Sequence, residues 1–212
     1  MTSITIIIVV ITCIISYVAF SNHKLYNDLI FYPPSISSNN QWYRFFTCGF
    51  IHADIGHLAF NMISLYLFGR NLEYYFAEIF AAKGPMLYIF LYISALGACL
   101  VPTYNKHKDD YGYRSLGASG AVSAVVFASI FLDPTNEIGF FIIPPIIPGF
   151  IFAPVYLFIS AYMSKKGADN INHSAHIWGA LYGIAFLIVT ALVLSGFNPI
   201  THFVNEISGY LQ

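Results

Sequence analysis

Six apolar segments, each close to the length of a membrane-spanning helix, constrain this chain more than any other feature. An α-helix needs about 20 mostly apolar residues to cross the hydrocarbon core of a bilayer. The segments lie at about 3–20, 55–75, 85–104, 116–132, 139–163 and 173–195 of the 212 residues. Only 9% of the residues are charged, compared with about 25% in an average soluble domain. The sequence therefore predicts an all-α membrane protein in which residues 1–212 form a single domain in the lipid bilayer.

The same composition excludes several other classes of protein. The formal net charge is -1 and no long basic run occurs, so no nucleic-acid partner is expected. The three cysteines are widely spaced, and neither CxxC nor HExxH occurs. We therefore expect no metal and no other cofactor. The first apolar segment lacks a basic stretch before it, which favours a retained membrane helix over a cleaved secretory signal.

The connection between the first two segments, residues 21–54, is unusual for a solvated loop. Its second half, from Trp42 to His52, is rich in aromatic residues. Trp and Tyr favour the interface between lipid and water, and irregular backbone at membrane depth survives only beside protein or a water-filled cavity. We expect a structured loop that lies in the membrane interface next to a cavity.

Polar residues that could carry out chemistry cluster at the starts of the second, fourth and sixth segments. In a bundle whose spans alternate in direction, these three starts lie on one side of the membrane. The residues are His52, His57 and Asn61, then Ser119, then His173 and His176. Polar groups at one depth in a membrane, supplied by three separate segments, predict a functional site.

Small residues predict how the fourth and sixth segments pack. The glycines concerned are Gly117, Gly120, Gly179 and Gly183. Such residues let membrane helices approach backbone to backbone, which would carry His176 towards Ser119. A serine beside a neutral imidazole is an activated nucleophile. For each motif alone simpler interpretations stay open, because a lone serine can serve packing and a histidine at a helix start can face water.

The second segment carries His57 and Asn61, which are four residues apart and share a helix face. A polar Asn inside a bilayer is costly unless it is paired. Asn61 therefore either links two helices by a hydrogen bond or donates to an oxygen that gains negative charge during a reaction.

Taken together and in this order, these motifs resemble the rhomboid family of intramembrane serine proteases. The matching segments are Tyr43-Arg44, His52 with His57-x-x-x-Asn61, Gly117-Ala-Ser-Gly120 and His176-x-x-Gly179-x-x-x-Gly183. The resemblance extends from about Trp42 to Gly183. Each motif alone is weak, but the ordered set is specific.

The resemblance implies a six-transmembrane-helix rhomboid bundle with a membrane-embedded first loop. It implies a Ser119–His176 catalytic dyad that cleaves transmembrane protein substrates, with the oxyanion held by Asn61, His57 and the backbone N–H of Ser119. It assigns structural support to His52, Arg44, Glu73, Gly117, Gly120, Gly179 and Gly183.

Two features depart from this resemblance. Some members of the family carry a tyrosine four residues after the nucleophile, stacked on the histidine, whereas this chain has Ser123, so the orientation of His176 must come from elsewhere. The distribution of Lys and Arg favours placing the polar segment starts at the cytoplasmic side, whereas the family places its active site away from the cytoplasm. We adopt the family orientation, in the plasma (inner) membrane of a bacterium.

Three other functions fit part of the sequence. A catalytically inactive relative would bind transmembrane helices, but both Ser119 and His176 are present. A transporter or channel would need a polar path, but not these motifs in this order. A metal or haem protein would use His52, His57, His173 and His176, and metal analysis of the purified protein would distinguish it.

The fifth segment contains four prolines, Pro144, Pro145, Pro148 and Pro154. Proline interrupts the hydrogen bonds of a helix and favours a kink. We expect this span to move as a lateral gate for a substrate helix.

Overall fold

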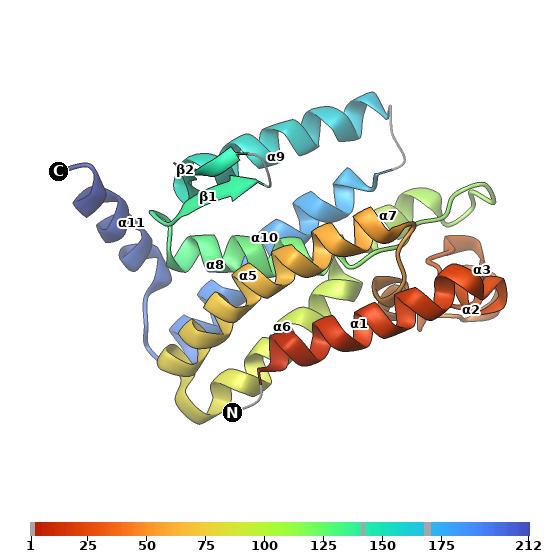
Figure 1. The fold of residues 1–212 in the computed structure, drawn as a ribbon, viewed down its shortest axis with the longest axis horizontal. Coiled ribbons are helices and arrows are strands. Elements are labelled where there is room, and N and C mark those ends of the chain that lie inside the picture. The colour runs from red at the N-terminus through yellow and green to blue at the C-terminus, as the bar shows by residue number, and fades with distance from the viewer. Residues whose placement is uncertain (1–2, 141–142, 168–170) are drawn as a thin grey trace.

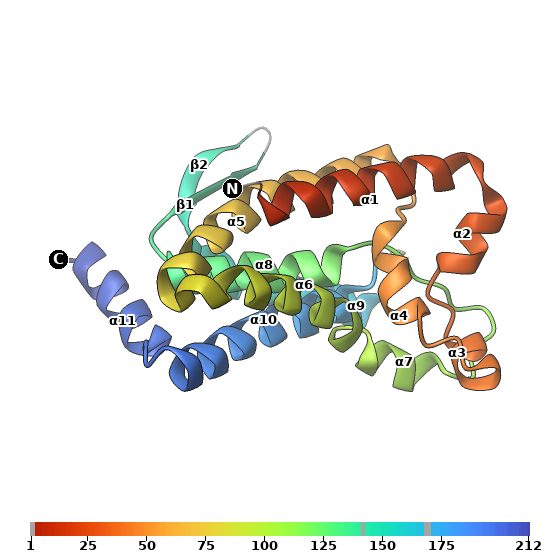
Figure 2. The same cartoon turned by 90° about the horizontal axis from the view of Figure 1, so that it is seen from below.

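The computed structural model describes residues 3–140, 143–167 and 171–212 of the chain. Helices make up most of it, and the longer ones have roughly aligned axes (Figures 1 and 2). In chain order the elements are α1 (Ile4–Ser21), α2 (His23–Leu29), α3 (Pro33–Asn39), α4 (Arg44–Thr47), the 3-10 turn η1 (Cys48–Phe50), α5 (Ile55–Phe80), the 3-10 turn η2 (Ala81–Lys83), α6 (Gly84–Ala98), α7 (Val101–His107), α8 (Ser119–Leu132), β1 (Glu137–Phe140), β2 (Ile143–Pro148), α9 (Gly149–Lys166), α10 (His173–Leu194) and α11 (Pro199–Tyr210).

Helix α8 lies at the centre of the structure (Figure 2). It contacts α5, α6, α9 and α10, and nearly all of its residues from Gly120 to Leu132 are buried. Glycine, alanine and serine are frequent in this helix, so its neighbours can approach its backbone closely. Ser119 is therefore the first residue of a helix that is held from several sides.

The most extensive helix contact joins α8 and α10. A Cβ atom at Gly179 would overlap the carbonyl oxygen of Gly120, and one at Gly183 would overlap the carbonyl oxygen of Ala124. Only glycine permits this backbone-to-backbone approach at the two positions. The small-residue spacing noted in the sequence thus corresponds to a direct contact.

Membrane-spanning length is found in three helical stretches of the described residues: Ile4–Ser21, Ile55–His107 and His173–Leu194. The second contains α5, η2, α6 and α7, and α8 is apolar but shorter. Large apolar side chains such as Phe158 and Val193 are exposed on the outside of the helices, which is typical of helices that face lipid. These findings confirm the predicted class, a mainly helical integral membrane protein.

The prediction of a proline-interrupted membrane span over 139–163 is wrong in its first part. Strands β1 and β2 form an antiparallel hairpin, with Glu137 opposite Pro148 and Ile138 opposite Ile147, and α9 begins only at Gly149. Prolines lack the amide hydrogen of a helix and push the preceding residue to an extended conformation, and the isoleucines among them favour strands. Only Pro154 lies inside α9.

Other boundaries also differ from the prediction. Helix α5 continues to Phe80, and the third expected span divides into α6 and α7, where Pro102 lies in the first turn of α7. Helix α11 has no counterpart among the predicted spans. It packs against α8 and α10, and the rings of Phe131 and Phe203 stack with centroids 4.6 Å apart.

Arg44 fixes the connection between α1 and α5. Its buried guanidinium donates to the carbonyl oxygens of Asn27 (2.8 Å) and Ile30 (2.7 Å) and to the side-chain oxygen of Gln41 (2.6 Å). A buried charge without such partners would be very costly. These bonds tie the end of α2 to α4, so Arg44 holds the first loop in its folded shape.

Glu73 of α5 holds the beginning of α1. Its carboxylate accepts hydrogen bonds from the backbone N–H of Ile4 (2.8 Å) and from the hydroxyls of Ser3 (2.6 Å) and Thr5 (2.9 Å). Amide groups at a helix N-terminus lack partners within the helix, and a negative charge there is favourable with respect to the helix dipole. Glu73 therefore caps α1 from a neighbouring helix.

His52 connects three parts of the chain just before α5. Its Nδ1 lies 2.9 Å from Oγ of Ser16 in α1, and its Nε2 accepts a 3.4 Å hydrogen bond from the backbone N–H of Ala118. Because Nε2 is the acceptor, Nδ1 carries the hydrogen and the ring is neutral. Burial, together with the nearby His57 ring, lowers the pKa of His52 from 6.5 to about 3.

We expect the folded protein to lose stability as the pH falls below about 6.5. Between this value and about 3, unfolded His52 binds a proton that folded His52 does not, which costs up to about 1.4 kcal/mol per pH unit. Thermal unfolding in detergent micelles at pH 7 and pH 5 measures the effect. His52→Gln keeps a hydrogen-bond acceptor but does not titrate. The free energy of unfolding that this variant loses between pH 7 and pH 5 should therefore be smaller than the wild-type loss by about 2 kcal/mol. Equal pH dependence of the two proteins would contradict the assignment.

Gly183→Ala should destabilise the protein, because the added methyl group would separate α10 from α8. Overpacking of this kind costs about 1–3 kcal/mol. Gly209→Ala, at a helical position with open space around its Cβ, is the matched control and should leave Tm unchanged or slightly higher. If both variants melt at the wild-type temperature, the close contact of α8 and α10 is not a source of stability.

Candidate active site

Ser119 and His176, 57 positions apart in the sequence, meet where α8 and α10 begin. Nε2 of His176 lies 2.7 Å from Oγ of Ser119. Ser119 begins α8, and His176 lies in the first turn of α10. The contacts at Gly179 and Gly183 bring these two helix ends together. A serine hydroxyl hydrogen-bonded to an imidazole has the geometry of an activated nucleophile.

The N-terminus of α8 provides a place for negative charge beside Ser119. The first amide groups of a helix have no partner within it, and the preceding residue, Ala118, has no polar side chain to cap them. The helix dipole adds partial positive charge at this end. The backbone N–H of Ser119 is therefore suited to bind an oxygen that carries negative charge.

Asn61 and His57 of α5 line the same cavity as Ser119. One N–H of the Asn61 amide donates to the carbonyl oxygen of His57 at 2.9 Å, and an amide group has a second N–H to give. The His57 ring lies against Gly117, where a Cβ would be 2.7 Å from its Cε1 atom. Gly117 also has φ of 109°, so a glycine is needed there for both its space and its conformation.

The cavity around these residues has a volume of about 990 Å³. Its polar groups lie near Ser119, whereas much of the remaining wall is apolar. The apolar part includes Phe60, Ile63, Leu67, Val126, Phe127 and Phe152. Because these residues come from α5, α8 and α9, the cavity extends between these three helices. This size and lining suit an extended, mainly apolar peptide segment.

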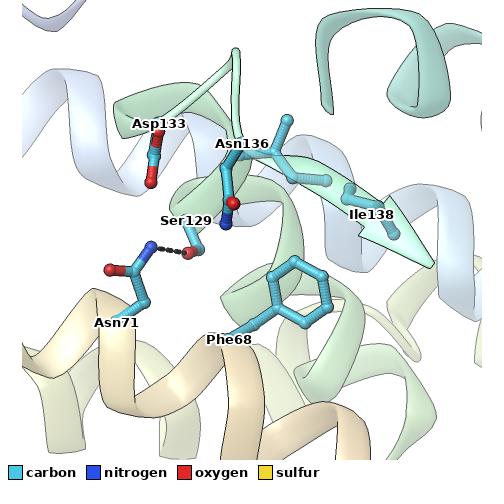
Figure 3. Close-up of a pocket in the computed structure, with 7 residues that line it drawn as sticks. Phe68, Asn71, Ser129, Asp133, Asn136 and Ile138 are labelled. Carbon is cyan, nitrogen blue, oxygen red and sulfur yellow. Dashed lines mark hydrogen bonds between the residues drawn. The ribbon is translucent and has the colours of Figure 1, made fainter. Parts of the chain in front are cut away.

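A second, small depression lies at the other end of α8, between α5 and β1 (Figure 3). Asn71 donates to Oγ of Ser129 at 3.2 Å, with Asp133 and Asn136 nearby. The side chains leave no interior volume for a ligand. This polar group joins α5 to α8 and takes no part in the site at Ser119.

The four histidines of the predicted site lie in two pairs. The rings of His52 and His57 have centroids 4.9 Å apart, and those of His173 and His176 are 5.8 Å apart. Within residues 3–140, 143–167 and 171–212, no group of three His, Cys, Asp or Glu side chains could hold a metal ion. The sequence offers no evident acid to complete a triad with His176, and Asp169, the carboxylate seven residues before it, lies outside the described residues.

Tyr156 is a residue of the site that the sequence motifs do not contain. It lies on α9, and its hydroxyl oxygen is 3.2 Å from Nδ1 of His176, on the opposite side of the ring from Ser119. The sequence signal that bears on it is indirect. This chain has Ser123 where the resemblance to the family leads one to expect a stacking tyrosine in some members, so another group has to orient His176. Arg44 and Glu73, by contrast, bind the first loop and the start of α1 rather than the dyad.

Known proteins similar to this chain include both plant and bacterial ones. RHOMBOID-like protein 12, mitochondrial, of Arabidopsis thaliana is 36% identical over 153 residues, which are 63% of this chain and 42% of that protein. The putative rhomboid protease YdcA of Bacillus subtilis (strain 168) is 30% identical over 156 residues, 72% of this chain and 70% of that protein. Rhomboid protease GluP of the same organism is 29% identical over 168 residues, 76% of this chain and 28% of that protein.

The chain spans about half or less of the length of the Arabidopsis relatives, at 42%, 51% and 44%. The family model described as Rhomboid domain matches residues 39–193. This match covers most of the chain and includes the Ser119–His176 contact, Asn61 and the glycines of α10. The chain therefore belongs to the rhomboid family of membrane proteins.

Proposed function

We propose that this protein is an intramembrane serine endopeptidase that cleaves transmembrane helices of other membrane proteins. The observation that carries the proposal is the 2.7 Å contact between Ser119 Oγ and His176 Nε2, at the polar end of a cavity lined by apolar side chains. Some relatives, YdcA and GluP, are named as rhomboid proteases. The family places this chain among membrane proteins, and the site geometry supports the chemistry.

In the proposed reaction Ser119 attacks the carbonyl carbon of a substrate peptide bond while His176 takes the hydroxyl proton. The tetrahedral intermediate collapses, the C–N bond breaks and His176 gives its proton to the leaving amine. Water then hydrolyses the acyl-enzyme with His176 as the base, which restores Ser119. The dyad needs no cofactor for these steps.

The oxyanion of the tetrahedral intermediate would be bound by three donors. The backbone N–H of Ser119 lies at the start of α8, and Asn61 and His57 face the same cavity from α5. Donors aimed at the oxygen that becomes charged are worth on the order of 10²–10³ in rate for each one. Asn61 thus combines a hydrogen bond within its own helix with a role at the site.

The proposed substrate is a transmembrane helix that enters from the lipid, unwinds locally and presents one peptide bond to Ser119. The proposed arrangement is a single membrane domain with six spans: α1, α5, α6, α8, α9 and α10. The segment between α1 and α5 is embedded in the membrane interface, where Trp42 and Tyr43 expose their rings. Helix α9, which carries Pro154, forms one wall of the cavity and acts as the lateral gate.

We place the protein in the plasma (inner) membrane of a bacterium, with the site facing away from the cytoplasm. Two relatives from Arabidopsis thaliana are named mitochondrial and chloroplastic. The alternative function is that of a catalytically inactive rhomboid-like protein that binds transmembrane helices. Such a protein would use the cavity but has no need for the contact between Ser119 and His176.

Ser119→Ala and His176→Ala should each reduce cleavage of a transmembrane reporter in liposomes by at least about 10³-fold. The measurement is the initial rate of product formation by the purified protein. Ser21→Ala and His23→Ala, which change the same residue types at exposed positions, are the matched controls and should cut at the wild-type rate. Equal rates for wild type and the two dyad variants would show that the activity comes from a contaminant.

A further inference from the structure

The imidazole of His176 is held from both of its nitrogens. Nε2 lies 2.7 Å from Ser119 Oγ, and Nδ1 lies 3.2 Å from the hydroxyl oxygen of Tyr156. Ser119, His176 and Tyr156 come from three different helices, α8, α10 and α9. The phenol therefore occupies the position at which a third group orients the base in a serine hydrolase.

The direction of these hydrogen bonds follows from the chemistry of the neutral ring. If Nε2 is to accept the proton of Ser119, the ring must carry its own hydrogen on Nδ1. That hydrogen then points to Tyr156, whose oxygen accepts it. The phenol hydrogen is then available to donate to another acceptor. Both nitrogens of His176 therefore have a partner in this arrangement.

Tyr156 is itself fixed by packing. Its ring lies 5.5 Å from that of Phe127 on α8 and 5.7 Å from that of Phe152 on α9, measured between centroids. Aromatic contacts at these distances favour defined relative orientations. The hydroxyl oxygen of Tyr156 is therefore held towards Nδ1 before any substrate arrives, as an orienting group requires.

We infer that Tyr156 is the positioning residue of the base: it accepts the Nδ1–H hydrogen bond of His176 and so sets both its tautomer and the direction of its ring. This inference rests on the proposed function. Ser123 stands where some rhomboid proteins have a stacking tyrosine, and in this chain the phenol is supplied by α9 instead. The same hydrogen bond is strengthened when His176 becomes an imidazolium during the reaction, because its donor is then charged.

Because Tyr156 lies on α9, the orientation of His176 depends on the position of that helix. Helix α9 is tied at its start to the turn that follows α8, where the N–H of Phe150 donates to the carbonyl of Pro134 at 2.8 Å. Tyr156 follows Pro154, which removes a hydrogen bond from the helix. A movement of α9 that widens the cavity would also draw the phenol away from His176. The alignment of the base thus depends on the helix that forms a wall of the cavity.

Tyr156→Phe tests the inference, since it removes the hydroxyl and keeps the packed ring. Loss of a hydrogen bond to a group that becomes charged should lower kcat by about 10- to 100-fold with KM almost unchanged. The rate of Ser119 labelling by a small fluorophosphonate should fall by a similar factor, because this probe needs the dyad but no gate. Tyr162→Phe makes the same change at an exposed position of α9 and should behave as wild type.

The labelling end point and Tm separate positioning from structure. A positioning role lowers the rate but leaves the final labelled fraction and Tm of Tyr156→Phe at wild-type values. Wild-type rates in Tyr156→Phe would overturn the inference while leaving the proposed function intact, and a reduced labelled fraction with a lower Tm would overturn it in favour of a packing role. If wild type is neither labelled nor active while properly folded, the proposed function fails and the role of Tyr156 fails with it.

Discussion

The contact between the backbones of α8 and α10 is the constraint on which the site depends. Gly179 and Gly183 lie directly on the carbonyl groups of Gly120 and Ala124, and no side chain separates the two helices there. Within lipid, helices gain little from burying apolar surface against one another, so close packing of this kind has to hold them together. Since His176 lies one turn before Gly179, the distance between the two backbones also sets the distance from imidazole to serine.

Polar groups in the rest of the membrane domain follow a second constraint, because a buried donor or acceptor without a partner is costly. Arg44 satisfies two backbone carbonyls of the first loop, and Glu73 satisfies the start of α1. His52 joins α1 to the segment just before Ser119. The contacts of Arg44 and His52 fix segments that border the cavity, whereas Glu73 fixes the start of α1, which does not line it. The surroundings of the site thus help to hold its groups in place. This matters because even a small displacement of the reacting groups strongly lowers the rate.

The parts of the structure that could be predicted from the sequence are those with a strong local signal. Long apolar segments indicated a membrane protein, and glycines at helical spacing indicated which helices touch, so Ser119 and His176 could be paired. The hairpin before α9 could not be predicted, because a short apolar run has no periodicity that separates strand from helix. Tyr156 could not be found either, since its contact depends on the rotation and register of α9 against α10. The spacing of residues in the sequence carries no information on the rotation and register of α9 against α10.

The proposed function depends first on Ser119 being a nucleophile that His176 activates. The most direct test maps the adduct of a fluorophosphonate by mass spectrometry of the intact, folded protein in detergent. We expect a single adduct on the peptide that contains Ser119, and its loss in a folded His176→Ala variant. An adduct on another serine, or equal labelling of Ser119 without His176, would show that His176 does not activate Ser119.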